Sequence, residues 1–225
     1  MTEITISVVT DFPIALDSPD HTHPWGTTHD NHCNLNFNER LRQLMPDWAV
    51  SVLDLGCAGG RFVKTLLDEN HFAVGIEGSD FSKRMNRSEW CEIPGNLHTA
   101  DITKPFHVQV NGTPVLFGVV TLWDVIEHLK REDLPMLFEN INAHLIPGGI
   151  VILSVSPNEE APDGVPLHQT VEGKAWWLNT FRGLGWQSHP GLVDHFGEQM
   201  VRTQRDAPGS FYFVLSRDNE EPVTR

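Results

Sequence analysis

The chain has 225 residues, with 30 Asp and Glu against 16 Lys and Arg, so its formal net charge is −14 at pH 7. This acidity argues against long nucleic acids as partners, because contact with phosphates needs a basic surface. At this length one domain with a single substantial core is expected. No stretch approaches the roughly 18 apolar residues of a membrane helix, and the N-terminus lacks a signal pattern, so we expect no membrane partner and a cytoplasmic location.

A polar, proline-punctuated leader comes first. Residues 4–9 resemble a short strand, and residues 37–45 place their apolar side chains on one helical face. Residues 18–34, expected to be nonhelical, hold four histidines and Trp25. The histidine spacings match no common metal site closely, and the scattered cysteines favour neither a disulfide framework nor a zinc motif. We therefore interpret residues 1–45 as a lid that shapes a ligand pocket, with Trp25 stacking or packing there and no metal bound.

A strand, a glycine-rich turn and a helix follow one another over residues 51–67. The turn, Gly56-Cys57-Ala58-Gly59-Gly60, lets backbone approach a ligand closely, and the start of the next helix presents unpaired N–H groups. A second apolar run, residues 72–76, ends at Glu77. An acid at this distance is placed to accept hydrogen bonds from ribose hydroxyls, so the pattern predicts an adenosine site.

Asp54 indicates which nucleotide-like ligand this site takes. It stands two residues before the first glycine, where a carboxylate would repel a pyrophosphate. The same charge suits a ligand with an ammonium or sulfonium group. S-adenosylmethionine is such a ligand, and we expect it as the cofactor.

From residue 51 onward, strands and helices alternate, which is typical of an α/β, doubly wound, mostly parallel sheet. The body of this domain is expected over residues 46–217, with a charged, frayed tail over residues 218–225. Helices are expected over residues 131–145, ending at Pro147-Gly148-Gly149, and over residues 172–184. The expected strands cover residues 51–55, 72–76, 96–99, 117–122, 150–155 and 210–216, with another beginning at residues 185–186.

Taken together, the motifs between residues 50 and 216 resemble the class I S-adenosylmethionine-dependent methyltransferases. Residues 54–60, 74–79, 99–102, 119–129 and 145–154 are similar to five successive family motifs, although the family more often has glycine where Ala58 stands. The resemblance implies a seven-stranded, Rossmann-like sheet with a closing β-hairpin. It implies Glu77 as the ribose acid, Asp101 at the adenine amino group and Ile102 along the ring. The cofactor-binding residues expected in full are Asp54, Gly56, Cys57, Gly60, Glu77, Gly78, Asp101, Ile102, Trp123 and Trp25.

Candidate catalytic residues follow the fourth and fifth strands of this motif order. In an open α/β sheet, ligands bind beyond the carboxyl ends of the strands. Asp124 and His128 follow the fourth strand, and His168 lies in the loop after the fifth. Either histidine could serve as a general base; otherwise His128 would be a packing residue at a helix start, and His168 a loop histidine that caps the next helix. His168 is slightly favoured as the base, because its loop is free to reach an acceptor. Asp124 is as plausible for orienting the substrate as for catalysis.

Three hypotheses for function remain open at this stage. The first is O-methylation of a small polar hydroxyl compound, such as a sugar unit or another small metabolite, with histidine as base. The second is metal-assisted methyl transfer by Glu127, His128 and His168, which resembles small-RNA 3′-terminal and quinone-pathway methyltransferases. The third is a cofactor-binding subunit without catalysis. Nothing in the sequence indicates an oligomeric state.

Overall fold

A seven-stranded sheet forms the centre of the protein. The computed structural model describes residues 4–225, and its main sheet has the strand order β4-β3-β2-β7-β8-β10-β9. Neighbouring strands are parallel, except that β10 runs antiparallel to β8 and β9. The predicted α/β, mostly parallel sheet is confirmed. Its strands are β2 (Ser51–Leu55), β3 (Phe72–Glu77), β4 (Leu97–Thr99), β7 (Phe117–Trp123), β8 (Leu145–Val155), β9 (Trp186–Ser188) and β10 (Phe211–Arg217).

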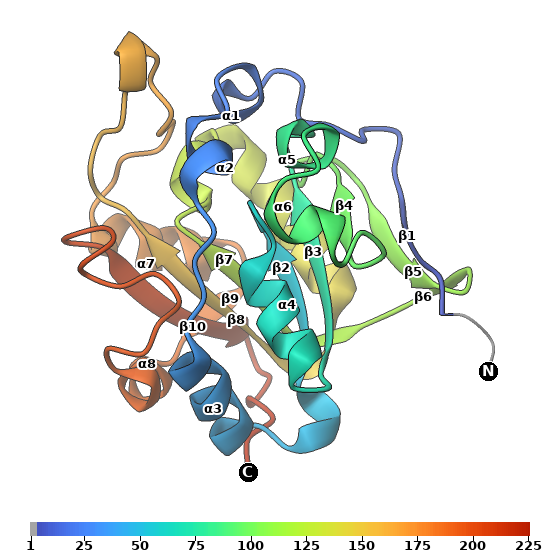
Figure 1. The fold of residues 1–225 in the computed structure, drawn as a ribbon. Coiled ribbons are helices and arrows are strands. Elements are labelled where there is room, and N and C mark those ends of the chain that lie inside the picture. The colour runs from blue at the N-terminus through green and yellow to red at the C-terminus, as the bar shows by residue number, and fades with distance from the viewer. Residues whose placement is uncertain (1–3) are drawn as a thin grey trace.

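Helices cover both faces of this sheet. Successive strand side chains point to opposite sides, and the apolar side chains on each side are buried under helices. Along β2, Val52 packs into one hydrophobic cluster, and Leu53 and Leu55 pack into the other. The first cluster lies under α3, α4 and α8, on the near side of the sheet in Figure 1, and the second lies under α6 and α7. The bounds of these helices are α3 (Leu35–Leu44), α4 (Arg61–Asp68), α6 (Leu134–His144), α7 (Lys174–Gly183) and α8 (Pro190–Phe196).

A small second sheet lies beside the main one. The strand expected over residues 4–9 is present as β1 (Ile6–Val9), and it pairs antiparallel with β5 (His107–Val110). β5 in turn pairs with β6 (Thr113–Pro114), completing the order β1-β5-β6. The sequence analysis missed β5, β6 and α8. The expected closing hairpin is present as the antiparallel pair of β9 and β10, but α8 and a long loop connect its strands.

The leader is more helical than expected. Residues 18–34 contain α1 (Pro19–Thr22) and α2 (Trp25–His29), so the nonhelical interpretation of this segment was wrong. Ser18 caps α1 by accepting from the backbone N–H of Asp20 at 3.2 Å, and Pro19 occupies the first turn, where its missing N–H costs nothing. Figure 1 shows α1 and α2 at the top of the molecule, at the opposite end from α3.

The boundary between α6 and β8 differs from the prediction. The helix expected over residues 131–145 consists of the turn η4 (Arg131–Asp133) and α6, and β8 already begins at Leu145. Pro147-Gly148-Gly149 lies within an irregular part of β8, where the pairing with β7 shifts register. Gly148 has φ +70°, a conformation that glycine adopts without strain.

The end of the chain packs against the domain. The backbone N–H of Val223 donates to the Gly148 carbonyl at 2.8 Å, and that of Arg225 donates to the Leu44 carbonyl at 2.8 Å. Residues 218–225 therefore differ from the frayed tail that their charged composition favoured, because their partners lie elsewhere in the chain.

No helix in residues 4–225 combines the length and apolar character needed to span a membrane. The remaining short helical elements are α5 (Phe81–Arg84), η1 (Asp47–Ala49), η2 (Ser88–Cys91), η3 (Ile126–His128) and η5 (Pro162–Gly164).

Candidate active site

A cavity of about 280 Å³ lies at the carboxyl ends of the parallel strands. Most of its wall comes from the turns that follow the strands and from the leader between residues 15 and 32, and the loop before β10 adds Val201 and Arg202. Most of the predicted site residues line it, namely Asp54, Gly56, Cys57, Glu77, Gly78, Asp101, Ile102, Trp123, Asp124 and His128. The topology therefore brings together residues that are far apart in the sequence.

The glycine-rich turn after β2 depends on left-handed backbone. Gly56 has φ +80°, and a Cβ at this position would lie 2.4 Å from a Val125 methyl carbon, so only glycine fits without a shift. Ala58 has φ +46°, which explains why glycine is common at this position in similar motifs. Gly60 has φ +90° but does not line the cavity. It begins α4, and its Cβ would meet Leu97, so its role is in the turn.

Three carboxyl groups line the part of the cavity next to this turn. Glu77 is buried, and its two oxygens accept from the backbone N–H groups of Ala58 at 2.8 Å and Ser79 at 3.1 Å. Burial raises the pKa of Glu77, and these donors oppose the rise. Burial also raises the pKa of Asp54 to about 7, although its Oδ1 accepts from the Thr121 hydroxyl at 2.7 Å. Asp101 Oδ1 accepts from the backbone N–H and the hydroxyl of Thr103.

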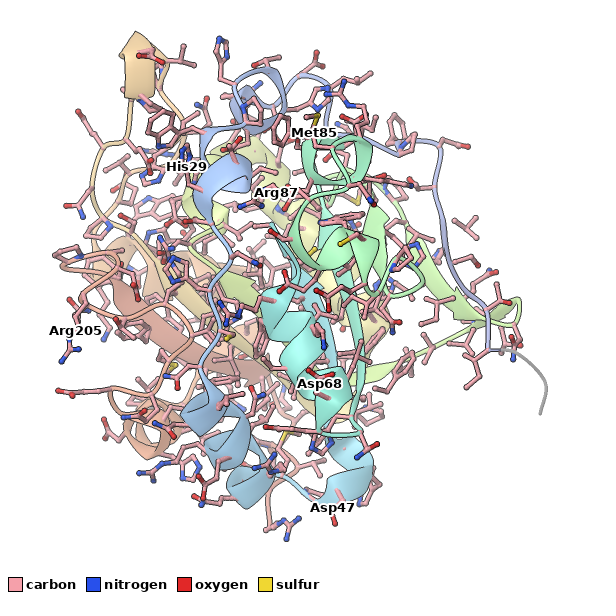
Figure 2. The ribbon with its side chains drawn as sticks, viewed as in Figure 1. His29, Asp47, Asp68, Met85, Arg87 and Arg205 are labelled. Atoms are coloured by element: carbon pink, nitrogen blue, oxygen red, sulfur yellow. The ribbon has the colours of Figure 1, made fainter. Side chains whose placement is uncertain are left out.

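Trp25 does not line the cavity, so the structure does not place it as a cofactor contact. Its side chain is 48% exposed, and its ring packs against His29 on the outer side of α2, where Figure 2 labels His29. Gly26 and Thr27, the next residues of α2, do line the cavity. Arg87, labelled beside α2 in Figure 2, holds this helix by donating to the Thr27 carbonyl at 2.8 Å.

Asp124, after β7, is fixed by two partners. Ser154 donates to its Oδ1 at 2.5 Å, and Arg202 Nε donates to its Oδ2 at 2.8 Å. Arg202 Nη1 also lies 3.1 Å from Asp30 of the leader. Burial opposes the charge of Arg202, but Asp30 and Asp124 raise the pKa of the guanidinium. Asp124 is thus held in an ion-pair network, which fits a positioning role better than proton transfer.

His128 presents its ring to the cavity from η3. Its Nδ1 lies 3.0 Å from Asp20 Oδ2, and the nitrogen must donate, because an ionised carboxylate only accepts. This arrangement directs the lone pair of neutral His128 to Nε2. Burial disfavours the charged ring, but Asp20, followed by Glu127 and Glu160, outweighs burial and raises the pKa of His128 to about 9.

His168 lies behind His128 and does not line the cavity, which argues against the slight preference for it as the base. Its Nδ1 lies 2.6 Å from the Asn158 carbonyl, and its Nε2 lies 3.3 Å from Glu160 Oε2. Both ring nitrogens are therefore engaged. The two histidine rings meet nearly edge to face, with centroids 4.5 Å apart, so His168 buttresses His128.

Sequence reasoning missed Asp20, Arg202 and Glu160. Asp20 lies in the histidine-rich leader, but no local pattern pairs it with a residue 108 positions away. Arg202 lies in a loop without periodicity. Glu127, in contrast, was noted as a metal ligand, but its Oε1 accepts from the backbone N–H of Ser156 at 2.6 Å.

A family model described as "Methyltransferase domain" matches residues 28–196. No curated protein matches the chain. Among solved structures, the CcbJ methyltransferase from Streptomyces caelestis has a TM-score of 0.55 and 13% identity, over 89% of this chain and 96% of that one. The glycopeptide N-methyltransferase MtfA complexed with S-adenosyl-L-methionine has a TM-score of 0.53 and 14% identity, over 85% and 89%. DhpI in complex with S-adenosylhomocysteine has a TM-score of 0.53 and 16% identity, over 89% and 90%.

The sheet order is that of the class I, Rossmann-like methyltransferase fold, and the cavity lies at its carboxyl edge. The chain belongs to the methyltransferase-domain family, and it is an enzyme that uses S-adenosylmethionine as its cofactor.

Proposed function

We propose that the enzyme methylates a hydroxyl oxygen of a small polar compound, such as a sugar unit or another small metabolite, with His128 as general base. The observation that carries this proposal is the Asp20-held His128 ring on the cavity wall. The net charge of −14 disfavours long nucleic acids, which supports a small acceptor. His168 supports the ring of the base in this proposal.

The residues around the turn after β2 fit the cofactor. Each carboxylate oxygen of Glu77 accepts one backbone N–H and keeps a lone pair for a ribose hydroxyl. Asp54 adds a buried acid suited to a cationic ligand, and Asp101 with Ile102 supplies a polar and an apolar contact for adenine. S-adenosylmethionine supplies a methyl group already activated on its sulfonium. The chain's own residues must align the acceptor and take its proton.

Proton transfer to His128 requires its neutral form. Because the pKa of His128 is raised to about 9, the ring is mostly protonated at pH 7. The neutral fraction rises with pH through that value, so turnover should also rise between pH 7 and pH 9.

The test of this function is a panel of acceptors, with formation of S-adenosylhomocysteine as the readout. The panel should contain sugars, phenols, carboxylic acids and primary and secondary amines, and each product should be identified by NMR. We expect a new methyl ether from a polar hydroxyl compound. Methylation confined to amines would contradict oxygen as the acceptor atom, but it would not contradict the assignment of the cofactor site.

A second candidate, metal-assisted methyl transfer, is favoured by one observation. Ligand atoms of His128, Glu160 and His168 lie within 4.8 Å of one another. Among the described residues, the acid of this cluster is Glu160, whereas the sequence predicted Glu127. The two Nδ1 atoms bond Asp20 and Asn158, an arrangement that also orients histidines toward metals.

A chelator separates the two candidates. With His128 as base, turnover of an acceptor found in the panel should stay within about twofold after EDTA treatment, because general-base catalysis needs no ion. Loss of turnover, followed by recovery on addition of Mg²⁺ or Mn²⁺, would favour the metal-assisted candidate. Glu160→Gln is the matched variant, since it should abolish recovery only if Glu160 binds the ion.

A further inference from the structure

The leader places a carboxylate directly on the candidate base. Asp20 Oδ2 lies 3.0 Å from His128 Nδ1, and both side chains are mostly buried, with 21% and 17% of their surfaces exposed. We infer that Asp20 is a positioning residue, which holds His128 in the tautomer and orientation that direct Nε2 toward the acceptor. The inference rests on the proposed function, in which His128 is the base.

The position of Asp20 is itself determined by contacts on both sides. Its backbone N–H donates to the Ser18 cap at the start of α1. Upstream, the backbone N–H of Ala15 donates to the carbonyl of Gly78, in the turn after β3, at 2.9 Å. Downstream, His21 Nδ1 lies 3.5 Å from the Ser79 hydroxyl. The backbone around Asp20 is therefore fixed relative to Gly78 and Ser79, which directly follow Glu77.

His128 faces several other titratable groups, and their bonds distinguish them from Asp20. Glu127 precedes it on η3, with Oε1 bonded to Ser156, and Glu160 and His168 approach from the loop after β8. Lys130 and Asp133 line the same cavity. Of the three carboxylates that raise the pKa of His128, Asp20 is the largest contributor and the one hydrogen-bonded to the ring. Its removal should affect both the charge and the tautomer of His128.

The test follows His128 by NMR in the full-length protein, without any ligand. Histidine labelled with ¹³C at Cε1 and with ¹⁵N in the ring reports the pKa and tautomer, and His128→Gln assigns the resonance. We expect Asp20→Asn to lower the pKa of His128 by about 1–3, the usual effect of losing an adjacent opposite charge. Above the pKa, the ring should also lose its preference for the Nδ1-protonated tautomer. Asp20→Glu should restore part of both properties.

The matched control is Asp11→Asn, the same change at an exposed acid of the leader outside the cavity wall. It should leave the titration of His128 unchanged. An identical titration curve and tautomer in Asp20→Asn and in the wild type would overturn the inference.

Turnover of an acceptor from the panel provides the second readout. Asp20→Asn should lower kcat at high pH by about 10-fold or more, as misorientation of a catalytic group does. Its pH–rate curve should also rise at lower pH than that of the wild type. If the NMR titration changes while kcat and the pH–rate curve do not, the Asp20–His128 hydrogen bond is supported, but His128 is not the base. That result would place the failure in the proposed function.

Discussion

Replacing His128 by alanine should lower kcat by about 10²–10⁴, the usual contribution of a general base. The affinity for S-adenosylhomocysteine should change little, because Asp54 and Glu77, the acids that we propose contact the cofactor, are unchanged. His168→Ala should have a smaller effect, since its ring nitrogens already bond Asn158 and Glu160. The measurement is initial-rate kinetics with the panel acceptor, and calorimetry with S-adenosylhomocysteine.

His107→Ala is the matched control, because His107 lies exposed on β5 in the small sheet. It should keep wild-type turnover. A larger loss in His168→Ala than in His128→Ala would reverse the assignment of the base. Near-wild-type rates in both variants would mean that catalysis depends on positioning alone.

Glu77→Ala should weaken the binding of S-adenosylmethionine by about 1.5–3 kcal/mol, because charge-assisted hydrogen bonds to the ribose are lost. This corresponds to about a 10- to 150-fold rise in Kd. Titration calorimetry measures the change directly. Glu77→Gln should fall between the wild type and the alanine variant, since the amide keeps one acceptor oxygen.

Glu77→Ala also removes the acceptor for the Ala58 and Ser79 backbone N–H groups, so the conformation of the turn can change. Thermal unfolding of the ligand-free variants shows whether the fold is retained. Glu139→Ala, at an exposed acid on α6, is the control and should bind the cofactor as the wild type does. Unchanged affinity in a folded Glu77→Ala variant would remove Glu77 from the ribose site.

The parts of this protein that sequence could predict are those whose signal is local. The strands over residues 51–55 and 72–76 appear as apolar runs because parallel strands are buried on both faces. The turn at Gly56 and the acid at Glu77 lie next to these runs, so their meeting at one sheet edge follows from topology.

What could not be predicted depends on pairing across the chain. The Asp20–His128 bond spans 108 positions, and the Asp30–Arg202 pair spans 172. β5 became a strand through pairing with β1, and α1 and α2 are too short for hydrophobic periodicity to reveal them. His168 does not line the cavity, and its ring nitrogens contact Asn158 and Glu160 of the same loop, where no periodicity predicts which way a side chain faces.

The residues that line the cavity come from separate stretches of the chain, and this has a consequence for how the choice of acceptor can change. The turns after β2 and β3 provide the groups suited to the cofactor, and they are built into the central sheet. The leader provides Gly26 and Thr27 from α2, and Asp30 directly after it. On the proposed function, we expect substitutions at these leader positions to change acceptor preference more than cofactor affinity.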